Sequence, residues 1–353
     1  MKKLELYKNN LRCGYTTGST AEAAVVAACN LLLYGEKIKF VKINTPSSYS
    51  FEIEIESFEI RGNKAIASAI KDGGDDKDAT SGLEIFAELS ENNLGENRFF
   101  GGKGIGIIKK KNLFGKIGDP AINPMPRKMI DKRLREDFPG HFFDITIFAP
   151  RGEEVAKKTY NKNFGIEGGI SIIGTSGIVE PMSLDALLKT IYIEIDTLIL
   201  NGEKDRIVFV PGSYGERFAK DLFLNPSLVQ VSNYMGDALT YAYEKNVRDF
   251  KLLGHIGKFS KLALGAFNTH NKVCDLRLES FVYYMAKRGI YDFDTIESFT
   301  SSEEAANYLI ENSMGFILDD MERGIEKRIK TYLKDDDIKV RAYIYTMEKG
   351  IKR

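Results

Sequence analysis

A histidine and a lysine stand close together in the run Gly254-His255-Ile256-Gly257-Lys258. Imidazole changes charge near neutral pH and is the most frequent general acid or base in enzymes. The run follows residues 249–253, a short apolar stretch that is typical of a β-strand. His255 is therefore a candidate for proton transfer at the C-terminal end of a strand, although a histidine with a purely structural role fits the same pattern.

Four carboxylates crowd into one turn, Asp72-Gly73-Gly74-Asp75-Asp76-Lys77-Asp78-Ala79-Thr80. Crowded carboxylates can accept protons from a ligand or position a cation. The spacing of the acids and glycines does not match an EF-hand calcium loop. We take Asp75 and Asp76 as candidate catalytic residues, with a solvated surface loop as the alternative interpretation.

A glycine turn, Pro211-Gly212-Ser213-Tyr214-Gly215, lies between an expected strand at 207–210 and an expected helix at 216–223. An open α/β sheet binds its ligand at this kind of strand-to-helix turn. No GxGxxG motif occurs there, and the next strand ends in Ser232-Asn233 without the acidic residue that would hold a ribose. The pattern therefore argues against NAD and leaves open a nucleoside-like ligand held by Gly212, Ser213, Tyr214, Gly215 and Asn233.

Glycines and hydroxyl residues open the first long apolar segment, in Gly14-Tyr15-Thr16-Thr17-Gly18-Ser19-Thr20. Such residues suit a helix N-cap, and a helix N-terminus is a ready anion site. A well-capped first helix without a ligand is the alternative. Further glycine-rich segments occupy 101–106 and 165–177. We expect their glycines to let the backbone approach a ligand closely, with tight turns and internal packing as the alternative.

The elements that must position these residues differ between the two halves of the chain. The first half has β-strand patterns at 37–44, 50–60, 64–70, 83–89 and 143–148, and a helix pattern at 124–138. The second half alternates short apolar strands with helices, which predicts βαβ units and a mostly parallel sheet. We predict an α+β domain over residues 1–178 and an α/β Rossmann-like domain over residues 179–353.

Composition narrows the class of function. The 353 residues include 50 Lys and Arg and 50 Asp and Glu, so no global field favours nucleic acid. The three cysteines, Cys13, Cys29 and Cys274, lack CxxC spacing, which indicates a reducing cytoplasm and no protein-bound metal. The apolar run from Ala21 is too short to cross a bilayer, so we expect no membrane segment. Nothing in the sequence indicates an oligomeric state.

Taken together, these segments resemble the CbiD family, the cobalt-precorrin-5B C(1)-methyltransferases of anaerobic cobalamin synthesis. The resemblance rests on motifs that follow one another in order through almost the whole chain. They are Leu11-Arg12-Cys13-Gly14-Tyr15-Thr16-Thr17-Gly18, Gly74-Asp75-Asp76, Gly101-Gly102-Lys103-Gly104, Pro120-Ala121-Ile122-Asn123-Pro124, Gly168-Gly169-Ile170-Ser171, Gly174-Thr175, Pro181-Met182-Ser183, Gly254-His255-Ile256-Gly257-Lys258 and Asn268-Thr269-His270.

The resemblance implies methyl transfer from S-adenosylmethionine to ring carbon C-1 of a corrinoid whose cobalt belongs to the substrate. S-Adenosylmethionine would bind at the turn of residues 212–215. His255 would orient the macrocycle or take up a proton, and the acidic turn and the first helix would face the macrocycle in a cleft between the domains. The side chains expected to bind the acetate and propionate groups of the macrocycle are Arg12, Tyr15, Thr16, Thr17, Lys103, Arg127 and Lys258.

The chain departs from the family pattern at a few positions. The family often has Thr-Cys in place of Ser19-Thr20, so a nucleophilic cysteine is not required there. It commonly has Pro at the position of Lys77 and His at that of Ser81, which argues against catalytic roles for these two residues.

Two other functions stay open at this point. An NAD(P)H-dependent tetrapyrrole reductase is disfavoured by the missing dinucleotide motif and the missing acidic residue for the ribose. A non-catalytic tetrapyrrole-binding protein is disfavoured by the presence of two separate glycine-rich centres.

Overall fold

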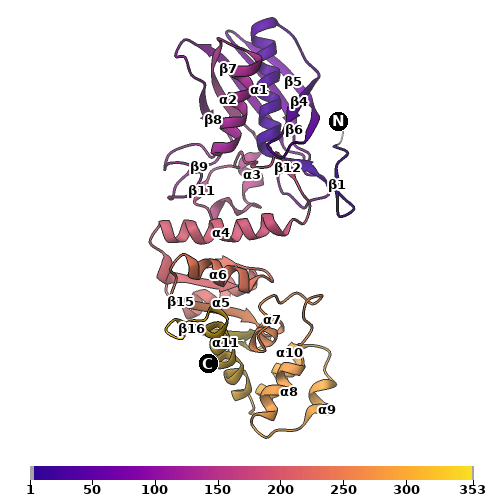
Figure 1. The fold of residues 1–353 in the computed structure, drawn as a ribbon, viewed down its shortest axis with the longest axis vertical. Coiled ribbons are helices and arrows are strands. Elements are labelled where there is room, and N and C mark those ends of the chain that lie inside the picture. The colour runs from indigo at the N-terminus through magenta and orange to yellow at the C-terminus, as the bar shows by residue number, and fades with distance from the viewer. Residues whose placement is uncertain (1–3, 352–353) are drawn as a thin grey trace. The chain divides into compact units, whose positions relative to one another are not determined.

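The computed structural model describes residues 4–351 and divides into two compact units, Met1–Leu184 and Asp185–Arg353 (Figure 1). The division falls later than the 178/179 boundary expected from the sequence. Strand β12 (Ile178–Val179) pairs antiparallel with β3 (Gly14–Tyr15), and this pairing holds residues 178–179 in the first unit.

The first unit is built on a six-stranded mixed sheet. Its strands, in spatial order, are β4 (Phe40–Asn44), β5 (Ser50–Arg61), β6 (Lys64–Ile70), β7 (Glu84–Asn92), β10 (Phe142–Phe148) and β8 (Arg98–Gly101). Neighbouring strands are antiparallel except for β10 and β8, which run parallel. The strands expected at 50–60 and 64–70 are observed as β5 and β6, which form an antiparallel hairpin, and Gly62 in its turn has a φ of 62°.

Two helices cover one face of this sheet. Helix α1 (Thr17–Tyr34) is rich in alanine, so it packs closely on β6 and β7 with almost its whole N-terminal half buried. Helix α2 (Pro124–Asp137) begins with a proline at its first position and packs beside α1. The apolar sides of these helices and of the sheet form the core of the first unit.

Shorter elements connect these parts. Strand β1 (Tyr7–Lys8) pairs with β2 (Leu11–Arg12), and β9 (Ile107–Ile108) pairs with β11 (Ile166–Glu167). Helix α3 (Gly152–Ala156) follows β10, and a separate 3₁₀ turn lies at Tyr160–Lys162.

The second unit is built on a five-stranded sheet. Its spatial order is β14 (Ser227–Gln230), β13 (Ile207–Val210), β15 (Asp249–His255), β16 (Lys339–Thr346) and β17 (Gly350–Ile351). The first four strands are parallel, and β17 is antiparallel to β16. The expected alternation of short strands with helices in this half is therefore observed, and a parallel arrangement follows from it.

Helices lie on both faces of the parallel sheet. They are α4 (Leu184–Leu200), α5 (Tyr214–Leu222), α6 (Met235–Glu244), α7 (Ile256–Ala263), α8 (Glu279–Ala286), α9 (Phe293–Glu297), α10 (Ser302–Glu311) and α11 (Phe316–Leu333). Helix α5 packs on the face that carries Val208 and Val210. Helices α6, α7 and α11 pack on the opposite face, against Phe209 and Leu252.

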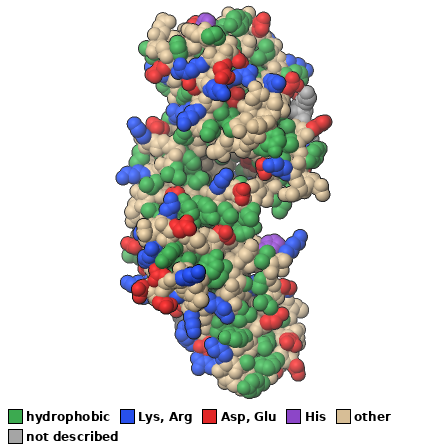
Figure 2. Space-filling model, viewed as in Figure 1, with side chains coloured by type: hydrophobic (Ala, Val, Ile, Leu, Met, Phe, Trp, Pro, Cys, Tyr) green, Lys and Arg blue, Asp and Glu red, His purple; other side chains and the backbone are tan. Residues whose placement is uncertain are grey.

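The surface carries both signs of charge. Figure 2 shows basic and acidic side chains interspersed over the visible face, in keeping with equal numbers of the two in the sequence. Within residues 4–351, none of the helices combines the length and the apolar character needed to cross a bilayer.

Candidate functional site

The C-terminal ends of strands β13, β14, β15 and β16 lie at one edge of the second unit's sheet, because the strands are parallel. The chain leaves β13 into α5 on one face and leaves β15 into α7 on the other face. Strands β13 and β15 are direct neighbours. Their exit loops therefore frame the kind of crevice in which open α/β sheets bind ligands.

The loop after β13 leaves open space at this edge. A Cβ added at Gly212 would meet no atom within 4 Å, so the backbone there is accessible. Ser213 is exposed, and the side chain of Tyr214 is 70% exposed. Gly215 is buried, and a Cβ there would lie 3.1 Å from Val210. The loop thus presents a glycine, a hydroxyl group and an aromatic ring to whatever binds this edge.

Asn233 belongs to the loop after β14, where it anchors another segment. Its Oδ1 accepts a hydrogen bond from Thr269 Oγ1 at 3.2 Å, and its carbonyl oxygen accepts one from Thr269 N at 3.0 Å. These contacts fix the Asn268-Thr269-His270 motif to the sheet edge. The amide nitrogen of Asn233 has no acceptor among the residues that the structure describes, so it stays free to donate to a ligand.

His255 ends β15 and caps α7. Its Nδ1 accepts a hydrogen bond from Gly257 N at 3.1 Å, and its Nε2 lies 2.5 Å from Glu303 Oε2. Since Nδ1 acts as an acceptor, we assign the ring proton to Nε2. Both ring nitrogens already have partners, which suits a positioning role better than proton abstraction.

Lys258 lies on the first turn of α7 and reaches across the sheet edge. Its Nζ donates to Ser232 O at 3.0 Å. Burial and the neighbouring Lys261 both lower the pKa of Lys258 below its usual value. Lys258 therefore ties the exit of β14 to the start of α7, close to His255.

Two of the four carboxylates in the acidic turn of the first unit form ion pairs within that unit. Asp72 binds Arg12 through both carboxylate oxygens, at 2.5 and 2.9 Å. Asp78 binds the fully buried Lys71 at 2.5 Å and also accepts from Thr80. Burial opposes ionisation of Asp78, but Lys71 and Thr80 outweigh it and lower its pKa. These two carboxylates hold the turn together.

The other two carboxylates are more accessible. Asp75 is exposed and accepts a hydrogen bond from the backbone N of Arg12. Asp76 is partly buried, and this burial together with the charge of Asp78 raises its pKa. Asp76 also accepts a backbone hydrogen bond from Met182. Within residues 4–351, no cluster of three or more His, Cys, Asp or Glu side chains could hold a metal ion.

The N-terminus of α1 has internal partners in place of an open anion site. Thr17 Oγ1 accepts from Ile173 N at 2.9 Å, and Gly18 N donates to Ile173 O. Thr16 caps the helix by accepting from Ser19 N. Tyr15 is 1% exposed and donates its hydroxyl to Ile70 O. Tyr15, Thr16 and Thr17 are thus buried and hydrogen-bonded within the first unit, and their contact with substrate stays a prediction.

The glycine-rich segments of the first unit approach other backbone segments rather than a ligand. A Cβ added at Gly104 would lie 1.8 Å from Ala149 O, and one at Gly169 would lie 2.3 Å from Gly104 O. Likewise, a Cβ at Gly14 would lie 2.3 Å from Asp72 O. All three glycines thus allow backbones to pack in direct contact, which supports internal packing over close approach to a ligand for Gly104 and Gly169.

Two of the predicted cationic contacts are also engaged internally. Arg12 pairs with Asp72, and Arg127 donates from Nε to Ile122 O at 2.7 Å and from Nη2 to Pro120 O at 3.3 Å. Burial lowers the pKa of Arg127. Lys103 differs from both, because it is exposed and has no ion-pair partner within the described part of the chain. Of the predicted cations, Lys103 and Lys258 keep donors available to a ligand.

Comparisons with known proteins agree along the whole chain. Two family models match, CbiD over residues 4–181 and the CbiD C-terminal domain over residues 268–352. A protein from Treponema denticola named cobalt-precorrin-5B C(1)-methyltransferase is 50% identical over 99% of both chains. The chain belongs to the CbiD family. A relative of the same name from Alkaliphilus oremlandii is 47% identical over 97% of this chain and 96% of its own.

A solved structure also carries the family name. The crystal structure of the cobalamin biosynthesis protein (cbiD) from Archaeoglobus fulgidus is 28% identical to this chain. The match covers 80% of this chain and 86% of the Archaeoglobus fulgidus chain, with a TM-score of 0.41.

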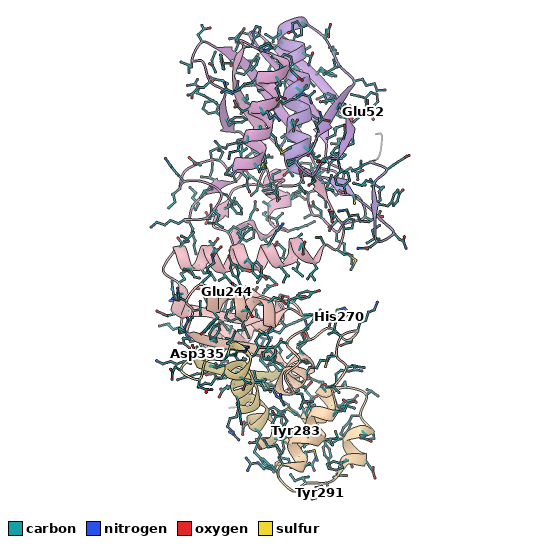
Figure 3. The ribbon with its side chains drawn as sticks, viewed as in Figure 1. Glu52, Glu244, His270, Tyr283, Tyr291 and Asp335 are labelled. Atoms are coloured by element: carbon teal, nitrogen blue, oxygen red, sulfur yellow. The ribbon has the colours of Figure 1, made fainter. Side chains whose placement is uncertain are left out.

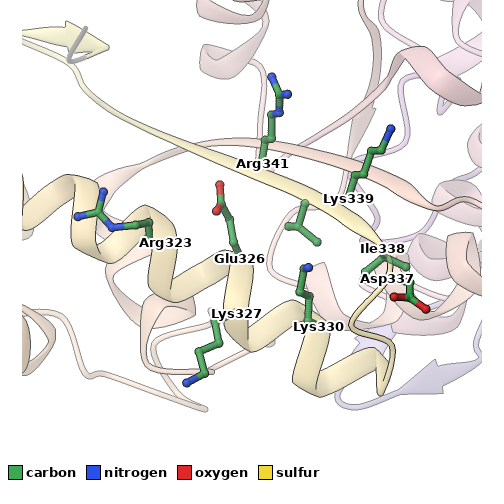
Figure 4. Close-up of a pocket in the computed structure, with 9 residues that line it drawn as sticks. Arg323, Glu326, Lys327, Lys330, Asp337, Ile338, Lys339 and Arg341 are labelled. Atoms are coloured by element: carbon green, nitrogen blue, oxygen red, sulfur yellow. The ribbon is translucent and has the colours of Figure 1, made fainter.

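One groove of this CbiD-family chain lies away from the sheet edge described above. It has a volume of about 540 Å³ and lies between the second half of α11 and the beginning of β16 (Figure 4). Its lining includes Arg323, Lys327, Lys330, Lys339 and Arg341. Because it opens at the N-terminal ends of the strands, we do not assign it to the candidate site.

Sequence reasoning missed three residues, two at the sheet edge of the second unit and one at the acidic turn of the first unit. Glu303 binds His255, Lys261 is 1% exposed beneath the edge of the sheet, and Lys71 pairs with Asp78. Glu303 stands in the first turn of α10, directly after the cap at Ser301. Neither lysine lies in a pattern that distinguishes it from a surface lysine, so no sequence signal could have identified them.

Proposed function

We propose that this chain transfers a methyl group from S-adenosylmethionine to carbon C-1 of cobalt-precorrin-5B, giving cobalt-precorrin-6A in cobalamin synthesis. The observation that carries the proposal is the 50% identity, over 99% of both chains, to a relative named for this reaction. The mixed α/β architecture with several sheets in two units is compatible with this proposal. A cytoplasmic location stays a prediction from the sequence.

We assign the two halves of the chain different roles. Residues 179–353 would form a Rossmann-like domain that binds S-adenosylmethionine, and residues 1–178 would form an α+β domain that binds the macrocycle. Strands β13 and β15 are neighbours, and the chain leaves them toward opposite faces of the sheet. Open α/β sheets bind ligands at such a point, which supports the first assignment. The open space at Gly212 also fits it, since a nucleoside would need close access to this backbone.

S-Adenosylmethionine supplies the methyl group, whose bond to sulfur breaks as the bond to C-1 forms, with the electron pair left on sulfur. The protein then has to align the two reactants and exclude water. Gly212, Ser213, Tyr214, Gly215 and Asn233 are the proposed contacts to the cofactor. Lys103 and Lys258 are the proposed contacts to carboxylates of the reactants.

His255 and Asp76 have the proposed supporting roles near the chemistry. His255 has partners at both ring nitrogens, which supports an orienting role for it. Asp76 is partly buried in the acidic turn, and this burial together with the charge of Asp78 raises its pKa, which supports a role for Asp76 in proton exchange. Asp75 stays a candidate because it is exposed.

Incubation of the purified chain with S-adenosylmethionine and cobalt-precorrin-5B under anaerobic conditions tests the proposal. We expect a product heavier by one methyl group and one equivalent of S-adenosylhomocysteine. Calorimetry with NADPH provides the contrast. Binding of NADPH without methyl transfer would favour a tetrapyrrole reductase, and binding of the macrocycle without turnover would favour a carrier.

A further inference from the structure

Two lysines of α7 lie at the ligand edge of the sheet without a negative partner. Lys261 is 1% exposed, and its Nζ donates to Thr269 O at 3.1 Å and to Asn271 Oδ1 at 2.5 Å. Lys258 lies one turn earlier and donates to Ser232 O at 3.0 Å. All three acceptors are neutral oxygens. Among residues 4–351, no carboxylate forms an ion pair with either lysine.

An uncompensated positive charge is unfavourable in such a place. Removing an ammonium group from water is costly unless a negative charge compensates it, which is why buried charges are usually paired. Two like charges one helical turn apart add to this cost, and the charge of Lys261 accordingly contributes to the lowered pKa of Lys258. Elsewhere in the chain the buried Lys71 has its own carboxylate, Asp78. The two lysines of α7 therefore lack the kind of carboxylate partner that the fold supplies to the buried Lys71.

Neutral donors lie beside the pair. Asn233 follows Ser232 in the chain and binds Thr269 through Oδ1, which turns its amide nitrogen toward other partners. Ser232 has a φ of 53°, a left-handed conformation that is uncommon for serine, and Lys258 holds its carbonyl oxygen. The loop that continues from Thr269 carries the exposed His270 (Figure 3). Asn233 therefore lies next in the chain to the residue that Lys258 binds, and the buried Lys261 lies one turn further along α7.

The group lies close to the proposed cofactor turn. Val231 N donates to Val210 O at 2.9 Å, which places the exits of β14 and β13 side by side. Gly212 is two residues beyond Val210, and Ser232 is one residue beyond Val231. A ligand that binds along Gly212 could therefore extend an anionic group toward Lys258.

We propose that Lys258 and Asn233, supported by the buried charge of Lys261, bind a carboxylate group of a reactant. This inference rests on the proposed function, whose two reactants both carry carboxylates. The carboxylate comes from the amino-acid part of S-adenosylmethionine or from an acetate or propionate group of the macrocycle. In either case it completes the missing ion pair and is held by Lys258 Nζ and Asn233 Nδ2, while Lys261 acts from below without touching it.

Calorimetry with two nucleosides distinguishes the sources. S-Adenosylhomocysteine carries the amino-acid carboxylate, and 5′-methylthioadenosine lacks the whole amino-acid part. If the carboxylate is that of the cofactor, Lys258→Gln weakens S-adenosylhomocysteine binding roughly 10- to 100-fold and leaves 5′-methylthioadenosine binding unchanged. If it is that of the macrocycle, both nucleosides bind as before, and the affinity for cobalt-precorrin-5B falls by a similar factor.

Matched variants complete the experiment. Lys261→Gln is expected to weaken the same ligand as Lys258→Gln, and thermal melting of both variants reports whether they fold. Lys327→Gln removes an exposed lysine of the same unit, far along α11, and is expected to change neither affinity. Unchanged affinities for all three ligands in folded Lys258→Gln would overturn the proposal.

A failure of the proposed function gives a different result. A wild-type chain that binds the macrocycle without turnover is still tested with the macrocycle, and for a wild-type chain that binds neither the nucleosides nor the macrocycle, glutarate becomes the probe. Stabilisation of the wild-type chain by glutarate that is lost in Lys258→Gln would still support a carboxylate site. Equal melting temperatures for the two proteins at every glutarate concentration would overturn it.

Discussion

Glu303 binds His255 across two segments of the second unit, with Oε2 of Glu303 2.5 Å from Nε2 of His255. The second carboxylate oxygen of Glu303 accepts from Met347 N at 2.7 Å, just beyond β16. His255 at the start of α7 is thus linked to the end of β16 through one carboxylate. The pair orients the imidazole, and it joins the exits of two neighbouring strands at the candidate site.

Replacement of His255 tests whether it orients or abstracts a proton. We expect His255→Gln to slow single-turnover methylation by less than the roughly 10²–10⁴-fold typical of a lost general base, because both ring nitrogens have partners in the protein. The rate measured against pH is expected to keep its shape. A loss of 10²-fold or more, with one titration removed from the profile, would instead identify His255 as the base.

The acidic turn allows a comparison between two of its carboxylates, Asp78 and Asp76, which are two positions apart. Asp78→Asn leaves the buried Lys71 unpaired, so we expect a loss of roughly 3 kcal/mol in unfolding free energy at pH 7. Because the pKa of Asp78 is lowered in the folded state, its contribution is present above the unfolded pKa and is lost as pH falls through the folded value. Urea denaturation between pH 3 and 7 measures both effects.

Asp76→Asn, unlike Asp78→Asn, is expected not to lower the unfolding free energy. Its raised folded pKa means that ionisation opposes folding at neutral pH, so removing the charge should not destabilise the chain. Methyl transfer should nevertheless slow if Asp76 serves the reaction. Full turnover in Asp76→Asn and also in Asp75→Asn would make the turn a structural feature only.

Two glycines offer a contrast between an open and a packed backbone. Gly212→Val adds a side chain where a Cβ meets no atom within 4 Å, so we expect a normal melting temperature and at least a tenfold loss of affinity for S-adenosylhomocysteine. Gly104→Ala places a Cβ 1.8 Å from Ala149 O at a φ of 79°, and should lower the melting temperature markedly. Unchanged calorimetry for Gly212→Val would move the cofactor site elsewhere.

Thr17 is expected to stabilise the first unit without contacting ligand. Its hydroxyl joins α1 to the segment around Ile173 and is 2% exposed. Thr17→Val keeps the shape but leaves Ile173 N without its partner, which should cost about 1–3 kcal/mol in unfolding free energy. Denaturation gives this value, and the KM values of the variant for both reactants should equal those of the wild type. A changed KM with normal stability would restore Thr17 as a binding residue.

Glu22 gives the stability of the chain a distinctive pH dependence. It is 3% exposed on α1, its Oε2 has no hydrogen-bond partner, and burial raises its pKa to about 7. The penalty for ionising it in the folded state therefore grows as pH rises from about 4.5 to 7 and stays constant above. Glu22→Gln should gain roughly 3 kcal/mol over the wild type at pH 8 and little at pH 4.5. A stability difference between variant and wild type that is independent of pH would contradict this.

Local patterns in the sequence determined much of the architecture of this CbiD-family chain. The alternation in β5 and β6, the turn at Gly62 and the cap of α10 at Ser301 each depend on residues a few positions apart. The strand-and-helix order of the second half likewise predicted parallel strands, which set the exits of β13 and β15 at one edge. The family resemblance also came from the sequence, because ordered motifs identify a family without any structure.

Only the tertiary structure decided which polar groups stay free for a ligand. Thr17 and Ile173 are far apart in the chain, and so are Arg12 and Asp72, yet each pair joins across the first unit and removes donors that the sequence had assigned to substrate. Lys261 shows the reverse case, a lysine whose buried place and missing counter-charge no local pattern reveals. The physical reason is the same for both. Hydrogen bonds and ion pairs at protein interiors depend on which segments meet in space, and the chemistry of a side chain alone does not specify its partner.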